Sequence, residues 1–358
     1  MITQLNPKQF IDATNQQRVE QFNSFVMQQD IDRLPIGLFG GKTGLAIYFY
    51  HQARLTGEKQ YEIFADKLLD TIQRQIHKEL PINLETGLTG ICYGFLHLIE
   101  NGFVNGNPNV VLKELEEKIF KMLYFLYLSE KQHNDIEVLK SIVHCSLYFC
   151  KRLTDKRLAK NEKHIFEQTI IRVINTIEMA AASEKMKEPY LFSRYDYFPV
   201  LYLELIEKVY KLGFYTYKLD KVCDEWNERL LSALPLLKSN RLLMAAAMEK
   251  VNVFHKSEKW QEHISLLRQK ADIETAIDTD FRNKNLCIAE GLTGFYLFLK
   301  ENNLLSDSIQ ELIFGKIAGS EIWRIFETGT DNDKLYHIGL MTGFPGVILV
   351  THPNNLRK

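Results

Sequence analysis

The sequence predicts an all-α protein, a closed α/α toroid of seven helical hairpins with an inner and an outer ring of helices. Three observations support this prediction. Glycine-leucine turns recur at a regular interval of about 50 residues. Apolar residues between the turns follow a helical period, and almost no segment alternates polar and apolar residues over the length of a strand.

The four turns lie near the two ends of the chain. The first two begin about 50 residues apart, the last two about 48, and the gap between the pairs equals about four more units. Seven units of this length account for nearly all of the 358 residues. The turns read Gly37-Leu38-Phe39-Gly40, Gly87-Leu88-Thr89-Gly90, Gly291-Leu292-Thr293-Gly294 and Gly339-Leu340-Met341-Thr342-Gly343.

Each hairpin is predicted to pair an amphipathic outer helix with an apolar inner helix. Residues 61–76 carry apolar side chains on one helical face and charged side chains on the other, which is typical of a helix with one side in water. After the turn, residues 95–99 are apolar on nearly every side, which indicates a helix enclosed by protein. The other inner helices are expected at residues 45–50, 142–149, 197–202, 242–247 and 295–299.

Proline and glycine support these boundaries. Pro199 is expected in the first turn of its helix, where a missing N–H costs nothing. The turn glycines are expected to accept positive φ and to let neighbouring backbones approach closely.

No glycine- or serine-rich linker divides the chain, so we expect one domain over residues 1–358. Because an open solenoid usually ends in degenerate polar repeats, the sharp turns at both ends favour a closed ring.

The composition is that of an ordinary globular protein, with 46% hydrophobic and 25% charged residues. The net charge of −1 gives no field that would favour nucleic acid or an anionic membrane. No apolar run reaches the roughly 18 residues of a spanning helix, and residues 1–6 lack the parts of a signal peptide. The five cysteines form no Cys-x-x-Cys pair, so reduced and mostly buried thiols in a cytoplasmic protein are expected.

The turns and their period resemble those of the lanthionine cyclase (LanC-like) family, and in particular its shorter bacterial members. The segments that carry the resemblance are Gly87–Gly94 with Ile99–Val104, and Gly339–Gly346. The resemblance implies an α/α toroid. It also implies a role in joining a cysteine thiol to a dehydrated residue of a precursor peptide, which closes a thioether ring.

The family's chemistry depends on a zinc ion held by two cysteines and a histidine, which presents the thiol as a thiolate nucleophile. A Cys-His-Gly triplet before the sixth turn supplies two ligands, and here it reads Ala289-Glu290-Gly291. The other cysteine belongs to a Trp-Cys-x-Gly turn, and the matching segment, residues 239–247, contains neither Trp nor Cys. The resemblance therefore implies a member without this zinc site, and no cofactor is expected.

Four residues are the candidates for binding a substrate. Cys287 and Glu290 lie in the sixth turn and His337 lies just before the last. Cysteine, glutamate and histidine are all zinc ligands, so these three residues are the candidates for a replacement metal site. Asp196 lies among aromatic residues before the fourth inner helix. Paired with Glu290, it would supply the two carboxylates of a glycoside hydrolase.

Two further features are interpreted as structural. Cys92 is expected in the core. His144 and Cys145 are adjacent on a helix, so their side chains point about 100° apart and do not form a nucleophile and base pair.

Three functions remain open on the sequence. The leading interpretation is a metal-free protein of the LanC-like type, a pseudoenzyme that binds a precursor peptide or assists other peptide-maturation enzymes. The second is an active cyclase that uses a replacement site. The third is a carbohydrate-active α/α toroid.

Overall fold

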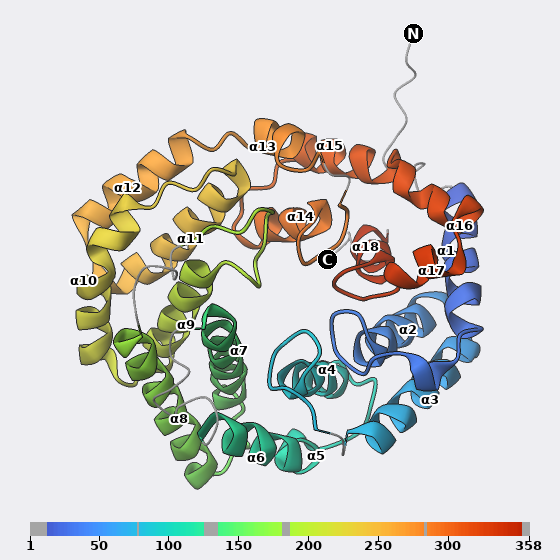
Figure 1. The fold of residues 1–358 in the computed structure, drawn as a ribbon, viewed down its shortest axis with the longest axis horizontal. Coiled ribbons are helices and arrows are strands. Elements are labelled where there is room, and N and C mark those ends of the chain that lie inside the picture. The colour runs from blue at the N-terminus through green and yellow to red at the C-terminus, as the bar shows by residue number, and fades with distance from the viewer. Residues whose placement is uncertain (1–12, 77–78, 125–134, 181–186, 283–284, 353–358) are drawn as a thin grey trace. The chain divides into compact units, whose positions relative to one another are not determined.

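The computed structural model describes residues 13–76, 79–124, 135–180, 187–282 and 285–352. Every regular element in these ranges is a helix, with no strand among them, which confirms the all-α prediction (Figure 1). The described residues form two compact units, one from Met1–Leu80 with Phe281–Lys358 and the other from Pro81–Asp280. The single domain expected over residues 1–358 stays a prediction.

The first unit, which combines the two ends of the chain, contains these helices: α1 (Ala13–Met27), η1 (Ile31–Arg33), α2 (Lys42–Thr56), α3 (Lys59–Gln75), α14 (Leu292–Glu301), α15 (Asp307–Ala318), η3 (Glu321–Arg324), α16 (Ile325–Thr328), α17 (Asp331–Tyr336) and α18 (Phe344–Thr351).

The second unit, from the middle of the chain, contains these: α4 (Leu88–Glu100), α5 (Pro108–Val111), α6 (Lys113–Met122), α7 (Ile136–Leu153), α8 (Lys160–Met179), α9 (Phe198–Leu212), α10 (Thr216–Ser232), α11 (Lys238–His255), α12 (Glu258–Gln269) and α13 (Ile273–Thr279).

The predicted inner helices all exist. The six apolar segments fall within α2, α4, α7, α9, α11 and α14, apart from Tyr197, which is the N-cap of α9. In α2, every residue from Lys42 to Tyr50 is buried, as expected for a helix enclosed by protein. Pro199 lies in the first turn of α9, as predicted.

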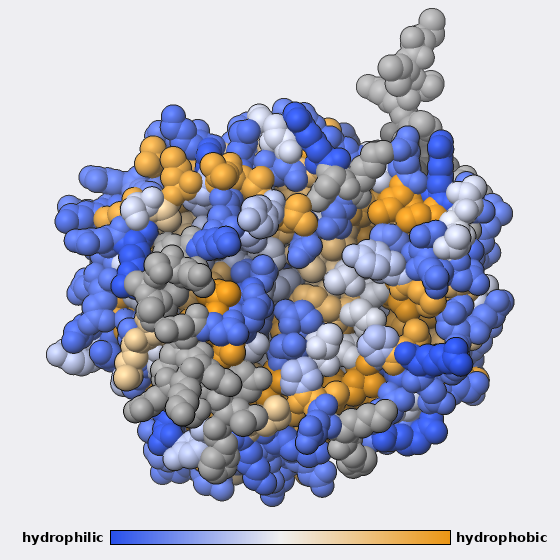
Figure 2. All heavy atoms as spheres, in the orientation of Figure 1, coloured by the Kyte–Doolittle hydropathy of each residue, from blue (hydrophilic) through white to orange (hydrophobic). Residues whose placement is uncertain are grey.

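The outer helices are amphipathic, as predicted. The buried side of α3 carries Tyr61, Phe64, Leu68 and Ile72, and the residues between them are mostly exposed. Figure 2 shows that the surface in view is mainly hydrophilic, with apolar side chains exposed in places.

Tyrosines link the inner helices to their outer neighbours. A hydroxyl on the inner helix donates to a carboxylate or amide oxygen on an outer one, which satisfies both polar groups inside an apolar interface. The pairs are Tyr48 with Asn23 (2.7 Å), Tyr50 with Asp66, Tyr148 with Glu116 (2.6 Å), Tyr202 with Glu178 (2.8 Å), Tyr210 with Asp220 (2.6 Å) and Tyr296 with Gln310 (3.5 Å).

A seven-residue loop ending in glycine precedes four of the inner-layer helices. Its closing glycine is the N-cap of the helix: Gly41 of α2, Gly87 of α4, Gly291 of α14 and Gly343 of α18. The next N–H donates to the carbonyl six residues before the glycine. These bonds are Lys42 to Pro35 (2.7 Å), Leu88 to Pro81 (2.8 Å), Leu292 to Asn285 (3.0 Å) and Phe344 to His337 (2.9 Å).

This loop corrects the alignment of the turns. The sequence matches Gly37 and Gly339 to Gly87, but the structure places both four residues before the N-cap glycine, inside the loop. The counterparts of Gly87–Gly90 are therefore Gly41–Gly44 and Gly343–Gly346.

The loop glycines are required for close approach and not for positive φ. Gly87 and Gly291 have φ values of −103° and −119°, which are extended conformations open to any residue, so that part of the prediction is wrong. A Cβ on Gly87 would lie 2.3 Å from the carbonyl oxygen of Pro81, and one on Gly291 would lie 2.5 Å from the amide nitrogen of Cys287. Both distances are far below van der Waals contact, because the loop folds tightly over its own start.

Within the first unit, the first and the last inner-layer helices contact each other. α2 packs against α18, and the Met341 N–H donates to the Phe39 carbonyl (3.1 Å). The Ala289 N–H donates to the Met341 carbonyl (2.8 Å), so the loops before α14, α18 and α2 form one hydrogen-bonded row. Within the first unit, these contacts join the first and the last glycine loops of the chain.

All five cysteines are free and buried, as predicted. Cys145 lies 3.0 Å from the Thr89 hydroxyl, and burial raises the pKa of its thiol to about 12. In the described part of the chain, no helix is long and apolar enough to cross a membrane.

Candidate functional site

Cys287 and Glu290 lie in the loop before α14 and contact each other through the backbone. The Glu290 N–H points at the Cys287 sulfur over 3.5 Å, and the Cys287 N–H donates to the Asn285 side chain over 3.1 Å. Cys287 is buried, which raises the pKa of its thiol. A buried thiol of raised pKa is a poor nucleophile when no cation stabilises its thiolate.

His337 lies at the C-terminal end of α17, where it begins the last glycine loop. Its carbonyl accepts the Phe344 N–H, and its ring packs against the Phe344 ring at 5.3 Å between centroids. Burial lowers the pKa of the imidazole, and the nearby Asp333 carboxylate opposes that shift only in part. The histidine is therefore neutral at pH 7 and half-buried beside an aromatic ring.

These residues do not fit the zinc ion that the family resemblance implies. The Ala289 side chain has no atom that could bind a metal ion, and its N–H donates to the Met341 carbonyl. Nowhere in the described ranges do three His, Cys, Asp or Glu side chains gather as ligands for a metal ion, and these ranges include Cys287, Glu290 and His337.

The segment that matches the missing cysteine turn is also occupied by other interactions. The Ser239 N–H and hydroxyl both donate to the Asp280 carboxylate at 2.8 Å. The Asn240 amide and the Leu237 N–H both donate to Glu188 at 3.0 Å. The N-terminus of α11, where the family has its cysteine ligand, is therefore hydrogen-bonded to the carboxylates of Glu188 and Asp280.

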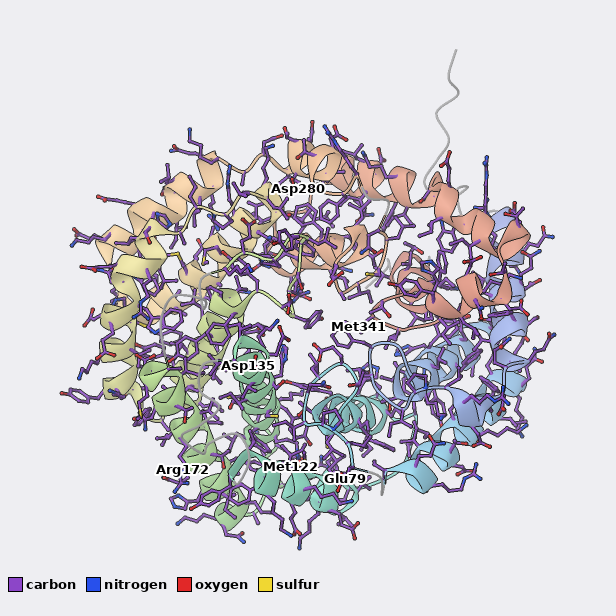
Figure 3. The ribbon with its side chains drawn as sticks, viewed as in Figure 1. Glu79, Met122, Asp135, Arg172, Asp280 and Met341 are labelled. Atoms are coloured by element: carbon purple, nitrogen blue, oxygen red, sulfur yellow. The ribbon has the colours of Figure 1, made fainter. Side chains whose placement is uncertain are left out.

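Asp196 belongs to a group of ionisable residues within the second unit. We call this group the Lys140 cluster, and its members are Glu85, Glu137, Lys140, His144 and Asp196. Lys140 lies one turn into α7 and forms ion pairs with Asp196 and with Glu137, the latter at 2.5 Å. The Lys140 side chain is only 10% exposed, whereas those of Asp196 and Glu137 are 50% and 72% exposed. Asp135, labelled in Figure 3, is the N-cap of α7 and marks this end of the helix.

The ion pairs determine the protonation of Lys140. Burial alone would lower the pKa of the ammonium, but the hydrogen bonds to Asp196 and Glu137 outweigh it and raise the pKa. Lys140 is therefore a fixed positive charge at pH 7.

Glu85 contributes a third carboxylate from the loop before α4. Burial raises the pKa of this side chain, and the charges of Asp196 and Glu137 raise it further, while Lys140 and the residue's own backbone lower it. No ion pair to Glu85 exists among the described residues, and the side chain is half-buried.

His144 lies one helical turn beyond Lys140, on the same face of α7. Burial lowers the pKa of its imidazole to about 4, with a further contribution from the positive charge of Lys140, so the ring is neutral at pH 7. The ring is almost fully buried, and its Nε2 atom has no hydrogen-bond partner in the described part of the chain. His144 and Cys145 have separate surroundings, as the sequence predicts.

The sequence predicted Asp196 as a site residue and His144 as a structural one, and it did not single out Glu85, Glu137 or Lys140. Lys140 and His144 are four residues apart on a mostly apolar helix, which is a visible signal of a polar stripe. Glu85 precedes the second glycine turn, but nothing in the sequence shows that its loop and the loop of Asp196 approach α7 together. Asp196 and Glu290 share a register, since each directly precedes the N-cap of its inner helix.

Scans of family models and of curated protein sequences find no match to this chain. Among solved structures, the chain is similar to the protein named nisin cyclase, with a TM-score of 0.55 and 12% sequence identity. The match covers 94% of this chain and 93% of that one. At this identity the likeness concerns the fold alone, and it shows that the chain shares the fold of a lanthionine cyclase over nearly its whole length.

Proposed function

We propose that this chain is a metal-free, peptide-binding protein of the LanC-like type, an accessory in the modification of ribosomal peptides by thioether rings. The observation that carries the proposal is the combination of a cyclase fold over nearly the whole chain with the loss of the zinc-ligand positions. Because function depends on the site and not on the fold, the missing ligands argue against zinc chemistry, whereas peptide binding needs no metal ion.

The proposal includes the finer architecture. The recurring glycine loops, the tyrosine links and the contact between α2 and α18 support the ring of seven hairpins that the sequence predicts. Within the first unit, the row of loops before α14, α18 and α2 offers backbone and short side chains to an extended peptide. We expect the protein in the cytoplasm, with peptide-maturation enzymes as its partners.

The alternatives receive less support. A replacement metal site needs several ligand side chains around one point, and no such group exists in the described ranges, which include Cys287, Glu290 and His337. A glycoside hydrolase needs Asp196 as one of two working carboxylates, but this side chain is engaged with Lys140.

A peptide selection with variants of the two loops tests the proposal. A displayed library of cysteine-, serine- and threonine-containing peptides is selected on the purified protein, and the enriched sequence is synthesised for affinity measurements. Glu290→Gln and His337→Asn are expected to weaken its binding while the melting temperature stays near that of the wild type. Leu96→Ala serves as the structural comparison, because truncating a buried leucine costs about 2 to 5 kcal/mol.

Two outcomes would overturn the proposal. One is a selection that enriches no peptide. The other is a fall in melting temperature for Glu290→Gln and His337→Asn as large as that for Leu96→Ala, since the two residues would then be structural.

A further inference from the structure

The Lys140 cluster has more negative than positive charge. It contains the carboxylates of Glu85, Glu137 and Asp196 and one ammonium, and its histidine is neutral at pH 7. The ammonium already has two of the carboxylates as partners. Glu85 forms no ion pair in the described part of the chain. Burial and the charges of Asp196 and Glu137 raise the pKa of its carboxyl, and Lys140, which opposes them, is already paired with the other two carboxylates.

His144 provides a second and independent sign of a missing partner. It is almost fully buried, it lies on the same side of α7 as Lys140, and its ring is hydrogen-bonded to the Tyr195 backbone, whereas Nε2 has no hydrogen bond within the described residues. Buried polar atoms are nearly always paired, so Nε2 is open to a partner from a bound group or from water.

We propose that the Lys140 cluster receives a cationic side chain, the ammonium of lysine or the guanidinium of arginine, from the bound peptide. Glu85 and the exposed part of Asp196 provide the counter-charges, and the neutral His144 adds no positive charge that would repel the guest. The inference rests on the proposed peptide binding and names which peptides bind: those with a basic residue at the position that reaches this cluster.

Other guests fit less well. An anion would have to displace Asp196 and Glu137 from Lys140 and would then face three carboxylates. A divalent metal ion prefers several carboxylates converging on one point, whereas here an ammonium lies between two of them and no metal-ligand group is found in the described ranges.

A matched pair of peptides tests the inference. The probes are acetylated and amidated Gly-Ser-Lys-Ser-Gly and the same peptide with norleucine in place of lysine. The lysine peptide is expected to bind the wild-type protein about tenfold more tightly, and this advantage is expected to fall as salt is added. Glu85→Gln is expected to remove the advantage and to leave the norleucine peptide unaffected. Glu262→Gln, an exposed carboxylate of α12, changes the net charge equally and is expected to leave both affinities unchanged.

A second readout separates this inference from the proposed function. The carboxyl carbon of Glu85 is followed by ¹³C NMR during titration with Nα-acetyl-lysine methylamide, with Glu85→Gln to assign the signal. Equal affinity for the two pentapeptides, with no shift of the Glu85 signal, overturns the inference and leaves peptide binding intact. A shift of that signal in a protein that binds no selected peptide supports the cationic site and overturns the peptide function. Silence in both measurements overturns both.

Discussion

The inner helices are held at their N-terminal ends in two different ways. Before α2, α4, α14 and α18, a glycine loop folds over itself and is closed by backbone hydrogen bonds. At α7 and α11, side-chain carboxylates do this instead: Asp135 caps α7, and Glu188 and Asp280 accept N–H groups of α11. α9 is tied to α7 by the ion pair of Asp196 with Lys140.

The difference shows how one repeat is maintained without its sequence signature. The glycine loops depend on the absence of a Cβ and are indifferent to charge. The other helix ends depend on charge and tolerate larger side chains in their loops. An added Cβ should therefore destabilise the glycine loops, whereas a change of charge or pH should destabilise the other helix ends.

The largest effect of a charge substitution is expected at the buried ion pair of Arg152 and Glu116 at 2.6 Å, which joins the C-terminal end of α7 to α6. The Arg152 side chain is fully buried, and Glu116→Gln removes its nearer carboxylate and leaves only the Asp155 carboxylate, at 3.5 Å, as an ion-pair partner in the described part of the chain. We expect a cost of about 3 to 5 kcal/mol in unfolding free energy. Urea denaturation measures the change, with the exposed neighbour Glu117→Gln as the control. A loss below about 1 kcal/mol, the value of a surface pair, would contradict the assignment.

A pH-dependent effect of about 3 kcal/mol is expected from His144. Its pKa is about 4 in the folded protein and near the ordinary 6.5 when unfolded, so the unfolded state binds more protons between these values. The unfolding free energy should therefore rise from about pH 4 to pH 6.5 and then level off, and His144→Gln should flatten this rise. The exposed His164→Gln should leave it unchanged, and an equally steep rise in His144→Gln would contradict the prediction.

In the glycine group, Gly87→Ala is expected to destabilise the protein by about 2 to 3 kcal/mol. The added Cβ would meet the Pro81 carbonyl oxygen at 2.3 Å, so the loop must open. Gly315→Ala is the matched control, because a Cβ there meets nothing within 4 Å inside α15. The control should stabilise the protein by about 0.5 to 1 kcal/mol, and the same gain at Gly87 would show that the loop is not tight.

The smallest effect is expected at α11. Asp280→Ala removes the acceptor of the Ser239 N–H and hydroxyl, at a cost of about 1 to 2 kcal/mol. Glu262→Ala on the exposed face of α12 should change the stability by less than about 0.5 kcal/mol. Equal effects of the two variants would show that carboxylates do not replace the glycine loop at this helix.

The period and the apolar segments were sufficient to predict the helices. The inner helices stand where the sequence places them, because a helix that is apolar on every side can only be enclosed. The register of the first glycine loop was misassigned because Gly37-Leu38 looks like Gly87-Leu88, although Gly41-Lys42-Thr43-Gly44 has the same Gly-x-Thr-Gly pattern as Gly87–Gly90. The hydrogen bond from Lys42 to Pro35 and the N-cap position of Gly41 show that Gly41 is the counterpart of Gly87.

The candidate site was less accessible from the sequence. Asp196 was found because it stands among aromatic residues, but its partner Lys140 is 56 residues away. Nothing local signals an approach over that separation, since it depends on how whole hairpins pack. The separate fates of His144 and Cys145 were predictable, because neighbouring residues on a helix face different directions.

The zinc content of the purified protein tests the metal-free account most directly. The protein is expressed with added zinc, purified without chelator and analysed by plasma mass spectrometry beside its Cys287→Ala variant. The account predicts a zinc content well below about one equivalent in both proteins, because no ligand set is in place. About one equivalent of zinc that disappears in Cys287→Ala would contradict it.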